Sequence, residues 1–154
     1  MTAATVVLVP GMRGTVEDHW QTRLAATLPH ARCVPPLGRT EPGLRTRVTL
    51  LDRIVDDVDG PAVLVAHSAG ALVAVHWAAG HRGTAVRGAL LATQALARAW
   101  GSRWHSLGAV EHLSPASGFG DWPEAVELIR DLASGAVQPE PDDAPLPWLQ
   151  RESA

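Results

Sequence analysis

The residues with the clearest chemical potential lie in the middle of the chain, where Ala66-His67-Ser68-Ala69-Gly70 joins an apolar run to an Ala-rich segment. This pentapeptide matches the G-x-S-x-G nucleophile elbow, with alanine in place of the first glycine. Small neighbours are needed because the turn is tight and lifts the serine hydroxyl above a sheet. Ser68 is therefore a candidate nucleophile, and the backbone amide of Ala69 is a candidate oxyanion donor. The alternative is that Ser68 only caps the helix that follows.

A serine hydroxyl becomes a good nucleophile only when a base takes its proton, and a neutral imidazole suits that task. The chain has seven histidines, of which His112 is the one in a loop after a late strand. His67 stands beside Ser68, but alternation along the strand points its side chain away. The other five are interpreted as surface or core residues, namely His19, His30, His76, His81 and His105.

The segment after the first apolar run supplies the other candidate site residues. The loop holding Met12 is expected to provide a second backbone donor to an oxyanion. His19 and Trp20 follow and are candidate walls of the pocket, although tryptophan belongs to the core more often than it touches a substrate. No metal or cofactor is expected, because Cys33 is the single cysteine and the histidines match no common metal signature.

These residues must be positioned by a regular scaffold, and the chain alternates β-branched runs with amphipathic stretches, which predicts parallel βα units. Strands are predicted over residues 5–9, 31–34, 62–66, 86–92 and 103–107, and helices over 15–28, 44–58, 69–81, 94–100 and 121–133. Capping boxes are predicted to start two of these helices, at Thr15 and at Asp121. Right-handed crossovers then give a three-layer α/β sandwich, whose mainly parallel sheet of about five strands has the order 2-1-3-4-5.

Length and composition limit the remaining possibilities. With 154 residues, of which 46% are hydrophobic, the chain is predicted to form one domain over 1–134 and a Pro-rich acidic tail over 135–154. All 13 basic residues are arginine, which excludes lysine Schiff-base chemistry. The net charge of −3 gives no reason to expect nucleic acid as a partner. No run reaches the ~20 apolar residues of a membrane span, so we expect a cytoplasmic protein without membrane contact. The absence of Lys, Asn and Tyr beside abundant Ala, Arg, Gly and Pro is typical of a high-GC bacterial genome. We expect a monomer or a homodimer.

The chain resembles the small serine hydrolases related to retinoblastoma-binding protein 9, which are compact α/β-hydrolases. The likeness covers most of residues 5–133 and implies an α/β-hydrolase-like fold, Ser68 as nucleophile and His112 as general base. We expect carboxylesterase-type hydrolysis of a small ester, because a site without its triad acid, described next, could still cleave an activated ester but not an amide. The matching stretches are Val7-Leu8-Val9-Pro10-Gly11, Asp18-His19-Trp20-Gln21, the elbow with His76-Trp77-Ala78-Ala79, and His112-Leu113-Ser114-Pro115-Ala116-Ser117-Gly118-Phe119-Gly120-Asp121-Trp122-Pro123.

The resemblance lacks the third member of the triad. In this fold the triad runs serine, acid, histidine, yet the one carboxylate between Ser68 and His112 is Glu111. Family members carry a further strand, after the one matching 86–92, whose end supplies an aspartate. That segment is missing here, so the strand over 103–107 is expected to pair directly beside 86–92.

Three interpretations of the missing acid remain open. In the first, another carboxylate completes the triad, the candidates being Glu111, Asp121, Asp142 and Asp143. In the second, Ser68 and His112 act as a weakened pair. In the third, the chain is a catalytically impaired relative that binds a small ligand or a protein.

Overall fold

The computed structural model describes residues 3–12, 14, 16–35, 43–81, 85–93, 107 and 112–136. Its sheet is parallel with the order β2-β1-β3-β4 and comprises β1 (Thr5–Val9), β2 (Ala31–Cys33), β3 (Ala62–His67) and β4 (Val86–Ala92). The predicted α/β class and the order of the first four strands are confirmed. The helix predicted over 94–100 and the strand predicted over 103–107 lie outside the described residues, except for Leu107.

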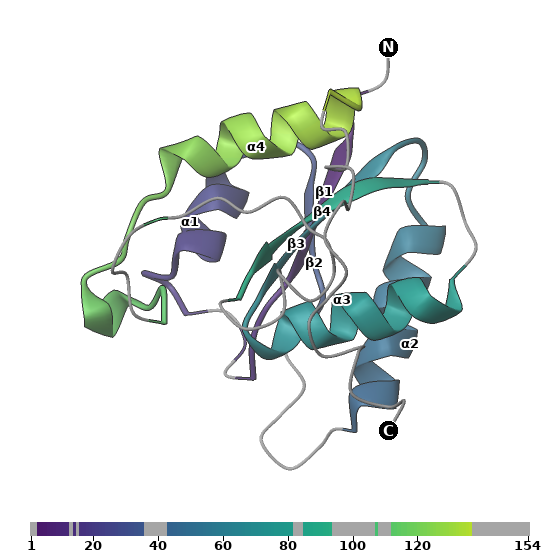
Figure 1. Ribbon diagram of the computed structural model, residues 1–154, viewed down its shortest axis with the longest axis horizontal. Helices are drawn as coiled ribbons and strands as arrows, with labels where there is room; N and C mark the ends of the chain where they lie inside the picture. The colour runs from purple at the N-terminus through teal and green to yellow at the C-terminus, as the bar shows by residue number, and fades with distance from the viewer. Residues whose placement is uncertain are drawn as a thin grey trace, which may run out of the picture.

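Helices cover both faces of the sheet, which gives three layers (Figure 1). One face carries α1 (Trp20–Thr27) and α4 (Pro123–Ser134), and the other carries α2 (Leu44–Asp56) and α3 (Ala69–Gly80). Every residue of β3 is buried, because alternate side chains enter the two apolar cores that these helix pairs form. Each helix in the described part of the chain is too short or too polar to cross a bilayer.

The register of the sheet brings two loops together at its carboxyl edge. Val9 of β1 pairs with Ala66 of β3, so the chain leaving β1 runs beside the chain leaving β3. A Cβ built on Gly11 would lie 3.4 Å from the Cβ of Ser68, which shows how closely the two loops approach. This edge is where ligands bind in open parallel sheets.

Gly70, in the first turn of α3, is the point of closest approach between that helix and β1. A Cβ placed on Gly70 would lie 2.0 Å from the carbonyl oxygen of Val9 and 2.7 Å from that of Pro10. Both neighbours are backbone atoms, so neither can rotate aside as a side chain would. The glycine that ends the elbow therefore allows α3 to start directly against β1.

Gly70→Ala is expected to lower the free energy of unfolding by about 3 kcal/mol or more, because overpacking against backbone forces a helix or a strand to move. Gly80→Ala is the matched control in the same helix, since a Cβ there meets nothing within 4 Å. It should change stability by less than about 1 kcal/mol, in the stabilising direction. Urea unfolding followed by circular dichroism measures both; equal stabilities would contradict the close packing.

Two predicted helix starts are wrong. The helix predicted from residue 15 begins at Trp20, after turns over 16–19, and its cap is His19, whose Nδ1 accepts from the Gln21 amide at 3.3 Å. Helix α4 begins at Pro123 with Trp122 as its cap residue and no side-chain cap bond, so Asp121 does not cap it. The carboxylates near these two starts, Asp18 and Asp121, both pair with Arg23, as described below.

Candidate active site

Ser68 occupies the turn between β3 and α3 in a backbone conformation that few L-residues adopt. Its φ is 54° and its ψ is −124°, a strained geometry of the kind that nucleophile elbows use to present a side chain above the sheet. Its side chain makes no cap bond to α3. The alternative interpretation, in which Ser68 serves only as a helix cap, is therefore not supported by its contacts.

The structure brings Ser68 and His112 into hydrogen-bond contact. The Oγ of Ser68 and the Nε2 of His112 are 3.0 Å apart, although 44 residues separate them in the sequence. The residue after the histidine, Leu113, has a φ of 52° and is buried. Among the described residues, Ser68 and Leu113 are the only non-glycine residues with positive φ, so backbone strain is concentrated on the two loops that meet here.

His67 holds the loop that begins at His112 in place, a role that its position in the sequence does not indicate. Its buried ring donates from Nε2 to the carbonyl oxygen of His112 at 2.9 Å, and the two rings lie edge to face at 5.1 Å. Strand alternation does turn His67 away from the Ser68 side chain. It turns it towards the layer of α1 and α4, where the loop beginning at His112 packs. Alternation gives the direction of a side chain, but it does not say which distant loop lies there.

Two backbone amides at the site are available to a ligand. The amides of Met12 and Ala69 donate to no acceptor within the part of the chain that the structure describes. Ala69 is the first residue of the twelve-residue helix α3, whose N-terminus carries partial positive charge. Met12 lies in the turn after β1, and the residue is 73% exposed.

His19 and Trp20, the candidate pocket walls, are packing residues. Trp20 is 1% exposed and packs edge-on against Trp122, with ring centroids 5.0 Å apart. His19 is buried and lies 4.7 Å from the ring of His67. Both rings pack against the ring of His67 and have almost no exposed surface that a substrate could contact.

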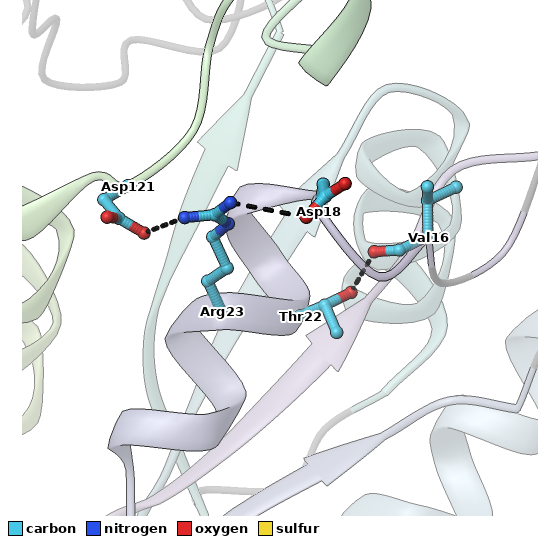
Figure 2. A network of polar contacts seen from close by, with 5 residues as sticks. All are labelled: Val16, Asp18, Thr22, Arg23 and Asp121. Atoms are coloured by element: carbon cyan, nitrogen blue, oxygen red, sulfur yellow. Dashed lines mark hydrogen bonds and ion pairs between the residues drawn. The ribbon is translucent and has the colours of Figure 1, made fainter.

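Asp121, one of the candidate acids, is engaged elsewhere. Its carboxylate accepts from Arg23 at 3.0 Å, and the same guanidinium reaches Asp18 at 3.4 Å (Figure 2). No carboxylate within the described ranges is hydrogen-bonded to His112. Glu111, Asp142 and Asp143 lie outside those ranges. The contact with Arg23 joins the entry of α1 to the entry of α4, which explains both acidic residues without a cap.

Three imidazoles share one small region, and two of them have lowered pKa values. Burial, followed by the neighbouring His67 and His112, lowers the pKa of His19 from 6.5 to about 4. Burial likewise lowers the pKa of His67, against the opposing effect of its bond to the His112 carbonyl. Both rings are therefore neutral at pH 7. A neutral His67 with its proton on Nε2 is the form that can donate to that carbonyl.

The low pKa of His19 predicts a pH-dependent stability. Because the unfolded chain takes up this proton near pH 6.5 and the folded chain only near pH 4, stability falls as the pH drops through that window. The slope is at most about 1.4 kcal/mol per pH unit for one group. His19→Asn should flatten the dependence while keeping the cap, since asparagine also accepts from the helix amides. The exposed His30→Asn is the control, and urea titrations between pH 7 and pH 4.5 compare them.

Asp52, Asp56 and His81 are the described residues that could hold a metal ion, since their ligand atoms lie within 4.8 Å of one another. The Oδ1 of Asp52 already accepts from Trp77 Nε1 at 2.8 Å and contacts His81 Nδ1 at 3.0 Å. The rings of Trp77 and His81 are stacked. This cluster lies away from Ser68. The contacts of Asp52 with Trp77 and His81 explain it as a polar link between α2 and the end of α3.

The chain is similar to known proteins in both sequence and structure. A family model described as "Serine hydrolase" matches residues 6–95, a range that contains the elbow. No curated protein gives a significant match to the chain. The fold is similar to the crystal structure of a YdeN-like hydrolase from Pectobacterium atrosepticum, with a TM-score of 0.76 and 21% sequence identity. The alignment covers 88% of this chain and 94% of that one, so the two share an architecture over nearly their whole lengths.

Proposed function

The chain belongs to the serine hydrolase family, and from this premise we propose that it hydrolyses a small carboxylic ester through Ser68 and His112. The observation that carries the proposal is the 3.0 Å contact between Ser68 Oγ and His112 Nε2. This distance allows direct proton transfer between hydroxyl and imidazole. The positive φ of Ser68 supports it, because the strain has no purpose in a serine that merely ends a strand.

The reaction follows from the positions of these groups. His112 Nε2 takes the proton of Ser68 while Oγ bonds to the ester carbonyl carbon, and the carbonyl oxygen becomes an oxyanion. The amides of Met12 and Ala69 donate to that oxygen. When the intermediate collapses, the alcohol leaves with the proton from His112, and the acyl group stays on Ser68. A water molecule then attacks the acyl group, again losing its proton to His112, which releases the acid and restores Ser68.

An ester is favoured over an amide as the substrate because of the missing acid. A triad acid holds the histidine in the correct tautomer and stabilises the imidazolium, and its loss typically costs about 10⁴ in kcat. No described carboxylate supplies that support to His112. An ester has a good leaving group and tolerates a weaker base than an amide does. The proposal is therefore a Ser–His pair of reduced power that acts on activated or unhindered esters.

The test is covalent labelling with a fluorophosphonate, a reagent that reacts with activated serines and needs no knowledge of the substrate. Labelled protein would be digested and the modified peptide identified by mass spectrometry. We expect modification at Ser68 alone. A folded protein that takes up no label and hydrolyses no nitrophenyl ester would refute the proposal in favour of a catalytically impaired binding module.

A further inference from the structure

Arg47 is a buried cation with an unusual set of partners. It lies in the first turns of α2 and is 8% exposed. No carboxylate lies within ion-pair distance of it in the described ranges. Its Nη2 instead donates to the carbonyl oxygens of Pro10 and Gly11, the latter at 3.4 Å. Burying a guanidinium without a counter-ion is costly in free energy. The two backbone carbonyls are the hydrogen-bond acceptors that Arg47 gains at this position.

Both carbonyls belong to the loop that runs beside Ser68. The Gly11 carbonyl has a second donor, because the Gly14 amide bonds to it at 3.2 Å and closes a turn over 11–14. The Pro10 carbonyl faces the start of α3, since a Cβ on Gly70 would lie 2.7 Å from it. The loop is thus fixed from α2 by Arg47, from within by its own turn, and from α3 by close packing.

A trans peptide unit points its carbonyl and its amide in opposite directions. The described structure contains no cis peptide bond. With the Gly11 oxygen held towards Arg47 and Gly14, the amide of Met12 in the same peptide unit must point away from them. That amide has no acceptor among the described residues, and Gly11 itself lies against Ser68.

We propose that Arg47 is a positioning residue for the oxyanion site: by holding the Pro10 and Gly11 carbonyls it fixes the orientation of the Met12 amide. The inference rests on the proposed function and extends it to a residue of α2. Arg47 makes no hydrogen bond to Ser68 or His112. Its effect on the reaction is therefore exerted through the backbone that runs from Pro10 to Met12.

The experiment compares a nitrophenyl ester with its thionoester, in which sulfur replaces the carbonyl oxygen. An oxyanion site stabilises developing charge on oxygen much better than on the larger, weakly accepting sulfur. Arg47→Met should lower kcat for the oxygen ester by about 10- to 100-fold, somewhat less than the 10²–10³ for deleting a donor outright. KM should stay within about threefold. The thionoester should be affected less, so the ratio of the two rates falls. Arg47→Lys, which keeps a cationic hydrogen-bond donor, should restore part of the ratio. If Arg47→Met does not fold, Arg47→Lys is the variant on which the ratio is measured.

Leu51→Ala is the matched control, because Leu51 is fully buried one turn further along α2 and packs in the core beside α3. It should lower the melting temperature and leave the ester-to-thionoester ratio unchanged. An equal fall for both esters in Arg47→Met would overturn the proposal, since it would reveal a general loss of structure.

Hydrogen exchange separates this inference from the proposed function. The Gly14 amide, bonded to the Gly11 carbonyl, should exchange at least about tenfold faster in Arg47→Met than in Leu51→Ala. Wild-type protein that cleaves neither ester would refute the proposed function, and the Gly14 exchange rate would still decide whether Arg47 holds the loop. Unchanged exchange would refute the role of Arg47 whatever the activity.

Discussion

Ser68→Ala is expected to abolish fluorophosphonate labelling and to lower kcat for a nitrophenyl ester by about 10²-fold. The size follows from the proposed Ser–His pair, for which no described carboxylate serves as the third member. Removing a complete triad costs about 10⁶ in kcat, and removing its acid alone costs about 10⁴. An enzyme that already lacks the acid therefore has only about 10² left to lose with its serine. Steady-state hydrolysis of the purified variant measures the effect.

Ser134→Ala is the control for this substitution, because Ser134 is a serine at the exposed end of α4. It should label and hydrolyse like wild type. Equal turnover by Ser68→Ala and wild type would eliminate the proposed nucleophile. A loss near 10⁶ would instead mean that a carboxylate outside the described residues completes a triad, and Glu111, Asp142 and Asp143 would be the variants to make next.

His112→Ala should reduce hydrolysis about as much as Ser68→Ala, again by about 10²-fold. The two groups transfer one proton between them across 3.0 Å, and residues that act as a unit have non-additive effects. The Ser68→Ala/His112→Ala double variant should therefore be no slower than either single variant. Kinetics of the three proteins on one ester completes the cycle.

The exposed His76, on α3, provides the control for this histidine, and His76→Ala should leave the rate unchanged. His67→Ala is informative for a different reason. It removes the donor to the His112 carbonyl without removing the base, so its loss in kcat should be smaller than that of His112→Ala. A larger loss in His67→Ala would contradict the assignment of His112 as the base.

The strands and the elbow could be predicted from the sequence because local signals determine them. The run over Ala62–His67 is apolar on both faces, which is typical of a central strand, and Ser68 follows it directly. The sequence also predicts the pairing of Ser68 with His112, because the stretch that begins at His112 resembles the histidine loop of the small serine hydrolases. These features depend on residue type and short spacing, which the sequence displays.

What the sequence did not reveal depends on contacts between distant segments. Thr15 and Asp121 have the residue types of helix caps, but the helices begin later, and the carboxylates of Asp18 and Asp121 both pair with Arg23. Nothing in the local pattern of His67 indicates that its acceptor is a carbonyl 45 residues further along. The sequence around Trp20 is compatible with a pocket wall, but the residue is buried in the core. In each case tertiary packing overrides a correct local preference.

Ser68 and the loop that begins at His112 are attached to the core by contacts of very different extent. Ser68 follows a fully buried strand with neighbours on both sides, whereas His112 is exposed and its loop is tied to that strand by the His67 bond and by the packing of Leu113. A loop with few buried contacts opens at a lower free energy than the core strands do, so it can detach while the sheet stays folded. Activity would then be lost before the fold unfolds. The denaturant concentration at half-inactivation should therefore be lower than the concentration at which half of the helical circular dichroism signal is lost.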